Sequence, residues 1–198
     1  MNSISLGFVG FGKLARLRLD TARQVPGYDP VGFFDPFTSS VDGLEKFQSP
    51  IDLFSDPRIN AVVISTPAAL TNKYVQEALQ AGLFVFAEKP PATAVKELQA
   101  TKELLDSLTD AVLMYGFNHR HKSSFIRIME VVESGELGNV LWMRGRYGKE
   151  IEEDFFSNWR ADFSLSGGGI LLDQGIHMLD LFLHLTGPFD EVKALVTN

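Results

Sequence analysis

Short apolar runs alternate with helical segments over residues 1–117, and these runs lack the apolar–polar alternation of a half-exposed strand. Strands are predicted over 4–9, 31–34, 61–65, 83–87 and 111–115, and helices over 13–22, 41–47, 69–81 and 94–108. A strand that is apolar on both faces needs cover on both, which is typical of a parallel sheet with helices on each side. Parallel strands joined through helices have right-handed crossovers. The sequence therefore predicts an α/β fold with a doubly wound parallel sheet.

The pattern changes after Asn118. Helices are predicted over 123–133 and 170–185, and strands over 139–147 and 191–197. The run at 139–147 is partly alternating, which is typical of an antiparallel sheet with one open face. We therefore expect a first, doubly wound domain over 1–120. Residues 121–198 are expected to form part of a second α/β domain with an open mixed or antiparallel sheet.

Composition and charge exclude several classes of protein. The chain has 18 Lys and Arg residues against 25 Asp and Glu residues, a net charge of −7, so binding to nucleic acid or to an anionic membrane surface is not expected. The absence of cysteine excludes disulfides, thiolate zinc sites, iron–sulfur clusters and a cysteine nucleophile. No apolar run reaches the roughly 18 residues of a membrane span. The first residues lead into a strand and not into a signal peptide, so a cytoplasmic protein is predicted.

A glycine-rich turn follows the first predicted strand. Its residues are Gly10-Phe11-Gly12-Lys13-Leu14-Ala15, a G-x-G-x-x-A sequence that opens a helix. Gly10 permits a tight turn, Gly12 lets the backbone approach a pyrophosphate, and Ala15 lets the helix pack close to the sheet. The phosphates would bind backbone N–H groups at the positive end of the helix. The motif alone fits a dinucleotide site and an ordinary glycine turn equally well.

An acidic residue ends the second predicted strand at the expected distance from this turn. Asp35 follows Gly12 by 23 residues, close to the offset of about 20 residues for the carboxylate that binds the adenosine ribose. No Arg or Lys lies between Asp35 and Glu45, so no cation is at hand for a 2′-phosphate and NAD is favoured over NADP. The alternative is a solvated turn aspartate before Pro36.

The third and fourth predicted strands also end in residues suited to a ligand crevice. Thr66-Pro67 turns the chain away from the sheet, where strand ends line the crevice of a doubly wound fold, although a plain turn explains the pair as well. Glu88-Lys89-Pro90 follows a buried strand directly, and charges there are usually paired or part of a site. Lys89 at this place suits a general acid or base. The alternative is an ion pair between Lys89 and Glu88.

The predicted helix over 170–185 carries its ionisable residues on one side. These residues are Asp173, His177, Asp180 and His184, which at about 100° per residue share a stripe about 60° wide. The rest of the helix is mostly apolar, so we expect it to be buried and the stripe to face a polar cleft or an internal network. Three interpretations stay open: metal ligands, a proton-transferring His177 oriented by carboxylates, and a structural core histidine.

Two polar segments lie near the predicted domain junction and before a triple glycine. Asn158-Trp159-Arg160 has an aromatic ring and a cation that suit a sugar face or an anionic group. Asn118-His119-Arg120-His121 suits the edge of a cleft. A loop anchored on its tryptophan and a solvated helix start are the respective alternatives.

Together these motifs resemble the Gfo/Idh/MocA family of nicotinamide-dependent oxidoreductases, particularly its members that act on sugars. The matching elements are Gly10-Phe11-Gly12-Lys13-Leu14-Ala15, Asp35, Thr66-Pro67, Ala81-Gly82 with Val85, Glu88-Lys89-Pro90, Asn118-His119-Arg120, Trp159-Arg160, Gly167–Gly169 and Asp173-x-Gly175-x-His177-x-x-Asp180. The resemblance implies that residues 1–120 are a Rossmann dinucleotide-binding domain. It implies further that Lys89 and His177 are the acid–base pair beside the nicotinamide and that no metal is needed. It also implies a substrate contact from Asp173, and we expect Asn118, Trp159 and Arg160 to contact the substrate as well.

The hypothesis that follows is an NAD-dependent oxidoreductase acting on a secondary alcohol of a sugar, nucleotide sugar or cyclitol. The cofactor would bind Gly10, Phe11, Gly12, Lys13, Leu14, Asp35, Thr66, Pro67, Glu88 and Lys89, with NADP less favoured. Family chains are longer than 198 residues, and their second domain completes a sheet that covers the substrate and forms the subunit contact. Here we therefore expect a partial second domain. We also expect homo-oligomers to form through that sheet. The alternatives are a catalytically silent dinucleotide-binding or sensor module, and a metal hydrolase using the 173–184 stripe.

Overall fold

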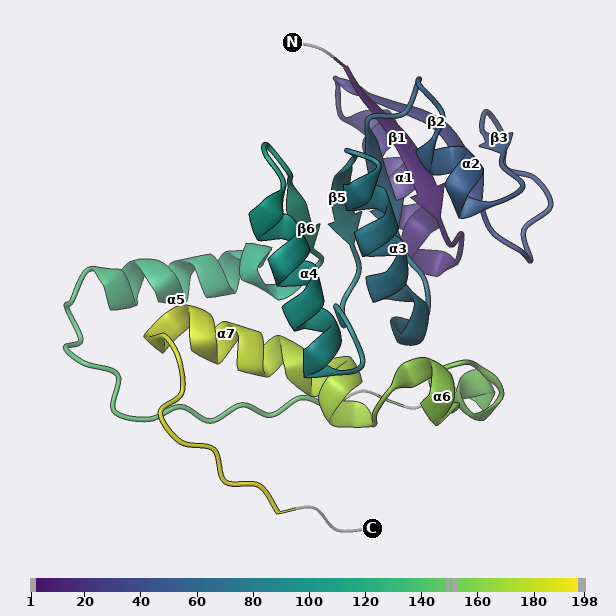
Figure 1. The fold of residues 1–198 in the computed structure, drawn as a ribbon. Coiled ribbons are helices and arrows are strands. Elements are labelled where there is room, and N and C mark those ends of the chain that lie inside the picture. The colour runs from purple at the N-terminus through teal and green to yellow at the C-terminus, as the bar shows by residue number, and fades with distance from the viewer. Residues whose placement is uncertain (1–2, 149, 151–152, 196–198) are drawn as a thin grey trace. The chain divides into compact units, whose positions relative to one another are not determined.

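A computed structural model of the chain describes residues 3–148, 150 and 153–195 (Figure 1). The chain forms two compact units. The first consists of residues 1–116 and 152–169, and the second of residues 117–151 and 170–198.

The first unit contains a parallel sheet, as the sequence predicts, but with six strands in place of the five predicted. Its strands are β1 (Ile4–Val9), β2 (Tyr28–Phe34), β3 (Glu45–Lys46), β4 (Ala61–Ile64), β5 (Phe84–Ala87) and β6 (Leu113–Tyr115). The spatial order is β3-β2-β1-β4-β5-β6, and every neighbouring pair is parallel. The order reverses on either side of β1, which is the doubly wound arrangement in which ligands bind beyond the carboxyl ends of the strands.

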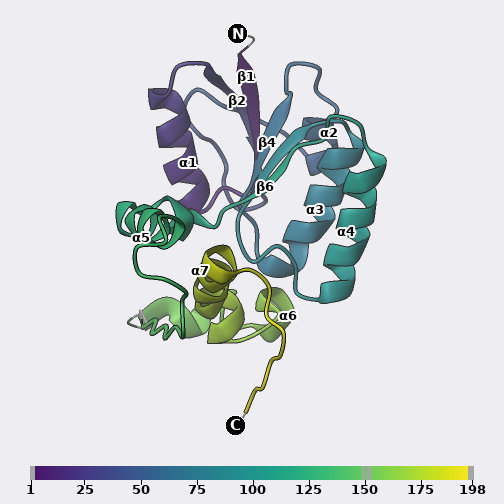
Figure 2. The ribbon, with the colours of Figure 1, turned by 90° about the vertical axis from the view of Figure 1, so that its left-hand side faces the viewer.

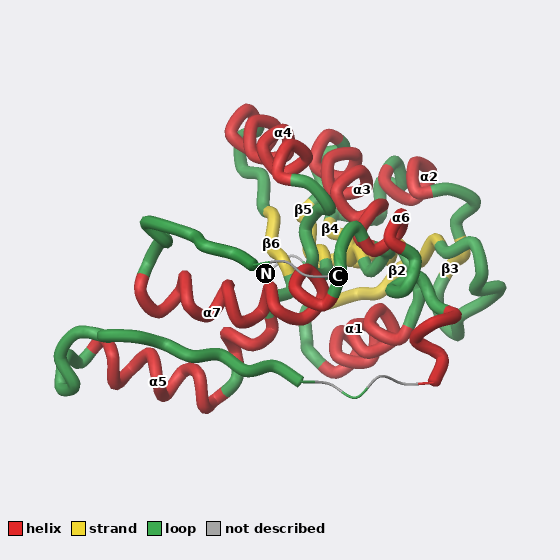
Figure 3. The backbone as a smooth tube through the Cα atoms, turned by 90° about the horizontal axis from the view of Figure 1, so that it is seen from below, coloured by secondary structure: helices red, strands yellow, loops and turns green. Residues whose placement is uncertain are grey.

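Helices lie on both faces of this sheet. They are α1 (Lys13–Gln24) on one face and α2 (Pro50–Phe54), α3 (Ala68–Gln80) and α4 (Val95–Ser107) on the other (Figures 2 and 3). The same unit holds the short helices η2 (Glu153–Ser157) and α6 (Phe163–Ser166). Each face has its own apolar core, one between α1 and the sheet around Phe8 and Leu19, the other under α2 and α3 around Leu53 and Val75. Burial of these continuously apolar strands is the main force that holds the unit together.

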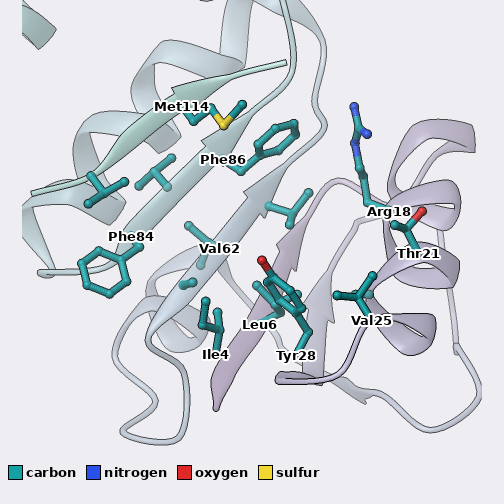
Figure 4. A pocket seen from close by; sticks show the side chains of 15 residues that line it. Ile4, Leu6, Arg18, Thr21, Val25, Tyr28, Val62, Phe84, Phe86 and Met114 are labelled. Carbon is teal, nitrogen blue, oxygen red and sulfur yellow. The ribbon is translucent and has the colours of Figure 1, made fainter. Parts of the chain in front are cut away.

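Helix α1 covers only part of its face of the sheet. Beyond it, the strands β4, β5 and β6 line an apolar pocket of about 400 Å³ that is rimmed by Tyr28 and Arg18 (Figure 4). Phe84, Val112 and Met114 point into this pocket and are about half exposed. The expected helix cover on both faces is therefore confirmed for β1 and β2 but is incomplete over β4–β6 within this unit.

The predicted helix over 41–47 is wrong. Val41 and Leu44 form an antiparallel bridge, and residues 45–46 are the edge strand β3. Gly43 has a φ of +70°, which interrupts a helix, and the Phe47 N–H bonds the Phe33 carbonyl of β2 instead of a helical turn. Pairing with a distant strand therefore overrides the local preference.

Helix α2 was not predicted, although its sequence carries a start signal. The Ser49 hydroxyl accepts a hydrogen bond from the Asp52 N–H, and Pro50 occupies the first turn. Serine followed by proline and an acidic residue is typical of a helix N-terminus.

The second unit is mostly helical among its described residues. It contains η1 (Asn118–His121), α5 (Ser123–Glu133), a π-helical turn η3 (Leu171–Gly175) and α7 (Ile176–Thr186). Helix α5 has the predicted bounds. The predicted helix over 170–185 is present, but the π-helical turn interrupts its regular spacing.

The predicted strands of the second unit need correction. The described residues at 139–147 and 191–195 form no strand, and residues 196–198 lie outside the described part. Leu141, Trp142, Val192 and Leu195 are strongly exposed. A strand is stable only when it is hydrogen-bonded within a sheet, and the described part of this unit contains no other strand to pair with. The open sheet expected over 121–198 is therefore not present among the described residues.

None of the helices in the described part of the chain is long and apolar enough to cross a membrane.

Candidate dinucleotide and proton-transfer site

The turn after β1 requires glycine at its first position. Gly10 has a φ of +80°, and a Cβ built there would lie 2.5 Å from the Ser65 carbonyl oxygen. Its N–H bonds the Phe34 carbonyl at 2.9 Å, so the turn is attached to β2. No other residue fits this backbone without displacing the end of β4.

The second glycine leaves space over the N-terminus of α1. Gly12 precedes the first helical residue, no side chain caps the helix, and its first turn contains no acidic residue. A Cβ at Gly12 would meet no atom within 4 Å. Ala15 is fully buried, which brings the helix close to the sheet. Open space in front of the positive end of a helix suits a pyrophosphate, so these residues fit a dinucleotide.

Asp35 connects the end of β2 to the glycine turn. Its Oδ2 accepts a hydrogen bond of 2.8 Å from the Phe11 N–H, and its Oδ1 accepts bonds from the Phe37 and Thr38 N–H groups. Partial burial opposes ionisation of this carboxyl, but the three backbone N–H groups outweigh it and hold the pKa of Asp35 below its ordinary value of 3.8. The carboxylate is thus part of the turn's structure as well as a candidate ligand for ribose hydroxyls.

Replacing Asp35 by asparagine should destabilise the protein more at neutral pH than in acid. Because the folded-state pKa lies below 3.8, the unfolded chain binds more protons as the pH falls through this range. The stabilisation by Asp35 is complete above the unfolded-state pKa and is lost as the pH falls through the folded-state pKa. Urea denaturation of both proteins from about pH 3 to pH 7 measures this. A stability difference that grows on acidification would contradict the expectation. Asp29→Asn, at an exposed carboxylate of β2, is the control.

Further sequence-predicted residues lie at the same edge of the sheet. Thr66-Pro67 follows the end of β4, and Glu88-Lys89 follows the end of β5. Since β2, β1, β4 and β5 are consecutive and parallel, their carboxyl ends share one edge with Asp35 and the glycine turn. The Thr66 and Thr71 hydroxyls lie 3.3 Å apart, and Thr71 also bonds the Thr66 and Pro67 carbonyls. Lys89 is half-buried.

A partly buried ion pair joins α1 to Glu88, the residue that follows the end of β5 and precedes Lys89. The Arg18 Nε donates to Glu88 Oε1 at 2.9 Å, and the Arg18 guanidinium also lies 4.9 Å from the centre of the Phe86 ring (Figure 4). Glu88 is buried, and a Cβ at Gly116 would approach its Oε2 to 2.7 Å. The pair therefore holds the helix that opens at the glycine turn against the end of β5.

Replacing Arg18 by methionine should lower the free energy of unfolding by about 2 kcal/mol, because it leaves the Glu88 carboxylate buried and unpaired. The Arg18 side chain is 29% exposed, so the cost is smaller than for a fully buried pair. The double variant Arg18→Met/Glu88→Gln should recover part of the loss, measured by a double-mutant cycle in urea. A double variant less stable than the additive sum would count against the pairing.

In the second unit, three aromatic rings lie around the imidazole of the predicted His177. The imidazole of His119 lies parallel to that of His177, with ring centres 4.1 Å apart and an angle of 19° between the planes. Tyr147 lies beside both rings at 5.7 and 6.5 Å, and Phe117 presents its ring at 87° to that of His177. His119 and His177 are both buried.

The next ionisable residue along α7 is held by an arginine from η1. Arg120 binds the Asp180 carboxylate through two nitrogens, with its Nε 2.8 Å from Oδ2. Asp180 is buried, whereas Arg120 is partly exposed. This bond raises the pKa of the Arg120 guanidinium. The Asp180 carboxylate therefore fixes η1 on α7 and belongs to an ion pair.

The expected stripe of four ionisable residues needs correction. The π-helical turn η3 widens the spacing before α7, so Asp173 does not follow the α-helical register that the stripe assumes. His177 and Asp180 are buried, Asp173 is half-buried with its Oδ2 bound by the Gln174 amide, and His184 is exposed near the Phe125 ring. The helix is also less buried than expected, since Leu179 and Leu183 are about 40% exposed. Among the described residues, no group of three or more histidine and acidic side chains could hold a metal ion.

The remaining predicted substrate residues belong to different units. Asn118 lies on η1 of the second unit, and this unit also contains Asp173 and His177. Trp159 and Arg160 lie in the first unit, where the guanidinium is 4.6 Å from the indole ring centre and the Arg160 N–H bonds Asn158. Trp159 and Arg160 therefore form a cation–π pair. This contact is compatible with both a sugar-binding and a loop-anchoring role.

Sequence reasoning missed Arg18, Arg120 and Tyr147 as partners of site residues. Arg18 had a detectable signal, because it lies on the side of α1 that carries the buried Ala15 and Ala22, where a charge needs a partner. The ion pair of Arg120 joins residues 60 positions apart, and no local pattern predicts it.

Comparison with known proteins identifies the family. The oxidoreductase family with the NAD-binding Rossmann fold matches residues 4–117, and the GFO/IDH/MocA C-terminal domain matches residues 125–198. The chain belongs to the Gfo/Idh/MocA family. Residues 4–117 form an NAD-binding Rossmann domain, as the resemblance implied.

Individual relatives within the Gfo/Idh/MocA family are moderately similar. Levoglucosan dehydrogenase of Pseudarthrobacter phenanthrenivorans is 32% identical over 74% of this chain and 38% of its own length. The NAD-dependent scyllo-inositol 2-dehydrogenase of Bacillus subtilis is 25% identical over 94% of this chain and 55% of its own. The chain thus spans about half the length, or less, of these curated relatives.

Solved structures of similar fold include an NAD-binding protein from Listeria innocua, with a TM-score of 0.77 and 25% identity. It is matched over 93% of this chain and 55% of its own. The scyllo-inositol dehydrogenase from Lactobacillus casei, solved with NAD(H) and scyllo-inositol, has a TM-score of 0.83 and 24% identity, over 94% of this chain and 57% of its own. At that identity the likeness to the Lactobacillus casei enzyme shows the fold alone.

Proposed function

We propose that this chain is the cofactor-binding and proton-transfer part of an NAD-dependent oxidoreductase that acts on a secondary alcohol of a sugar, nucleotide sugar or cyclitol. One observation carries the proposal: a single edge of the parallel sheet gathers the glycine turn, Asp35, Thr66-Pro67 and Lys89. The Gfo/Idh/MocA relatives support the substrate class, since their names include dehydrogenases of levoglucosan, scyllo-inositol and myo-inositol.

The residues present fit NAD better than NADP. The backbone at Gly10–Gly12 would hold the pyrophosphate, and Asp35 would accept hydrogen bonds from the ribose hydroxyls. A carboxylate at this place repels a 2′-phosphate, and the segment after it offers no cation up to residue 45. Relatives of both cofactor preferences exist, with names that specify NAD in one case and NADP in another.

When bound, the nicotinamide supplies the acceptor or donor of the hydride. Lys89 and His177 serve the proton transfer: one of them takes the hydroxyl proton of the substrate as the carbon–hydrogen bond on the same carbon breaks. Asp173, Asn118, Trp159 and Arg160 orient the polyol through hydrogen bonds and ring stacking. Asp180 takes no part in proton transfer, because Arg120 holds its carboxylate.

Calorimetric titration with NAD and NADP, followed by an absorbance assay for reduced nicotinamide, tests this function. Suitable alcohols are scyllo-inositol, myo-inositol, levoglucosan and glucose 6-phosphate. Binding of NAD with turnover of any of these alcohols supports the proposal. Binding without turnover identifies a silent dinucleotide-binding module, and the absence of NAD binding overturns both interpretations.

A further inference from the structure

In the stacked pair of histidines of the second unit, His177 is proposed to transfer the proton, whereas His119 has no role in the reaction as described so far. His119 comes from η1 and His177 from α7, and their ring centres lie 4.1 Å apart with nearly parallel planes. Both side chains are less than 10% exposed. This is a close, face-to-face contact between buried rings, and the nearly parallel orientation of the two ring planes is set by the packing of the unit.

An ion pair fixes the two backbones that carry these rings. Arg120 follows His119 directly, and Asp180 lies about one turn beyond His177 on α7. The two-point bond between the guanidinium and the buried carboxylate sets both the distance and the direction between η1 and α7. The His119 ring is thus held against His177 by a contact outside the stack itself.

The ring of His177 is enclosed on further sides by aromatic groups. The Phe117 ring stands at 87° to it, and Tyr147 lies beside the stack at 6.5 Å. The Arg120 guanidinium lies 5.7 Å from the centre of the Phe117 ring, which connects this side of the enclosure to the same ion pair. Turning the imidazole out of its plane would require His119 or Phe117 to move.

We propose that His119 is a positioning residue for His177, an inference that rests on the proposed function. Its flat ring fixes the plane of the His177 imidazole, so that a ring nitrogen keeps the direction needed to exchange a proton with the substrate hydroxyl. A proton-transfer group acts only within hydrogen-bond reach and along a defined line, so loss of this support lowers kcat more than it alters substrate binding. The role of His119 is to supply a flat ring and not to carry charge.

The experiment compares His119→Phe, which keeps a flat ring, with His119→Leu, which removes it. His121→Leu is the matched control, because His121 lies on the same short helix and is exposed. In steady-state assays of the full chain, His119→Leu should lower kcat by about 10- to 100-fold with little change in KM. His119→Phe should restore most of the loss, and His121→Leu should match the unsubstituted protein.

A second measurement does not depend on turnover. The carbon-bound ring protons of His177, assigned with a His177→Asn variant, should show the upfield NMR shift of a stacked ring in the unsubstituted protein and in His119→Phe. That shift should be lost in His119→Leu. His177 signals that do not respond to the residue at 119, or equal kcat values for His119→Leu and the unsubstituted protein, overturn the proposal.

The two measurements also separate this inference from the proposed function. If the unsubstituted protein turns over no alcohol, the proposed function fails and the catalytic role of His119 fails with it, while the NMR shifts still decide whether the rings stack. If turnover is present but His119→Phe is as impaired as His119→Leu and remains folded, a flat ring is not sufficient and the positioning role is wrong.

Discussion

Replacing Lys89 by methionine is expected to lower the kcat for oxidation of a cyclic polyol by about 10²- to 10⁴-fold, the usual contribution of a positioned acid or base. Methionine keeps most of the length and apolar volume of lysine but cannot transfer a proton. The residue lies at the end of β5, next to Glu88, whose pairing with Arg18 does not involve the substituted side chain. The backbone at this edge of the sheet should therefore stay in place, and the loss of NAD affinity should be small beside the loss of kcat, because Lys89 is one of ten residues expected to contact the cofactor. Steady-state kinetics and calorimetric titration with NAD measure the two effects separately.

Two variants make this result specific to the site. Lys96→Met removes an exposed lysine from α4 and should leave kcat unchanged. Lys89→Arg keeps the positive charge but places it on a planar group that does not release its proton, so it should stay impaired. Full activity of Lys89→Met would show that proton transfer does not use this residue, and equal loss in Lys96→Met would point to a general effect of charge.

The Rossmann half could be predicted from sequence because its information is local. The strand at Ile4–Val9 has the predicted bounds, since a continuous apolar run specifies its element directly. The glycine turn and Asp35 are likewise fixed by short spacings. The helix predicted at 41–47 failed where a contact between Phe47 and Phe33 decides the structure.

The second half was less predictable because its decisive features are not local. A common stripe of Asp173, His177, Asp180 and His184 requires α-helical spacing from Asp173 onward. The π-helical turn breaks that spacing before His177. Gly175 marks the turn, since a Cβ there would approach the Leu171 side chain to 2.7 Å, but a glycine in a helical run does not by itself predict a π turn. Strands at 139–147 and 191–197 were predicted from local sequence patterns alone, and a local pattern cannot say whether a partner strand is present.

The residues that support the candidate site come from distant parts of the chain. Arg18 reaches Glu88 across 70 positions, and Arg120 reaches Asp180 across 60. A charge among apolar residues on a helix shows that a partner must exist, but it does not identify the partner. The sequence thus predicts which groups carry the chemistry, while the structure is needed to find what holds them in position.

Replacing Gly10 by alanine is expected to lower the free energy of unfolding by about 3–5 kcal/mol, the sum of left-handed strain and overpacking. The strain comes from a φ of +80°, and the overpacking from a Cβ that would lie 2.5 Å from the Ser65 carbonyl oxygen and 2.9 Å from its carbon. These atoms are backbone at the end of β4, so they cannot turn aside as a flexible side chain would. Relief requires β1 and β4 to separate at the edge where NAD is proposed to bind.

Gly82→Ala isolates the strain from the clash. Gly82 follows α3 with a φ of +77°, nearly that of Gly10, but a Cβ there would meet no atom within 4 Å. Its substitution should cost only about 1–2 kcal/mol and leave NAD affinity unchanged. Urea denaturation and NAD titration of both variants give the comparison. If the two substitutions cost the same, the close approach of Gly10 to Ser65 does not exist in solution. If Gly10→Ala alone loses both stability and NAD affinity, the narrow turn between β1 and α1 is the element that holds the cofactor.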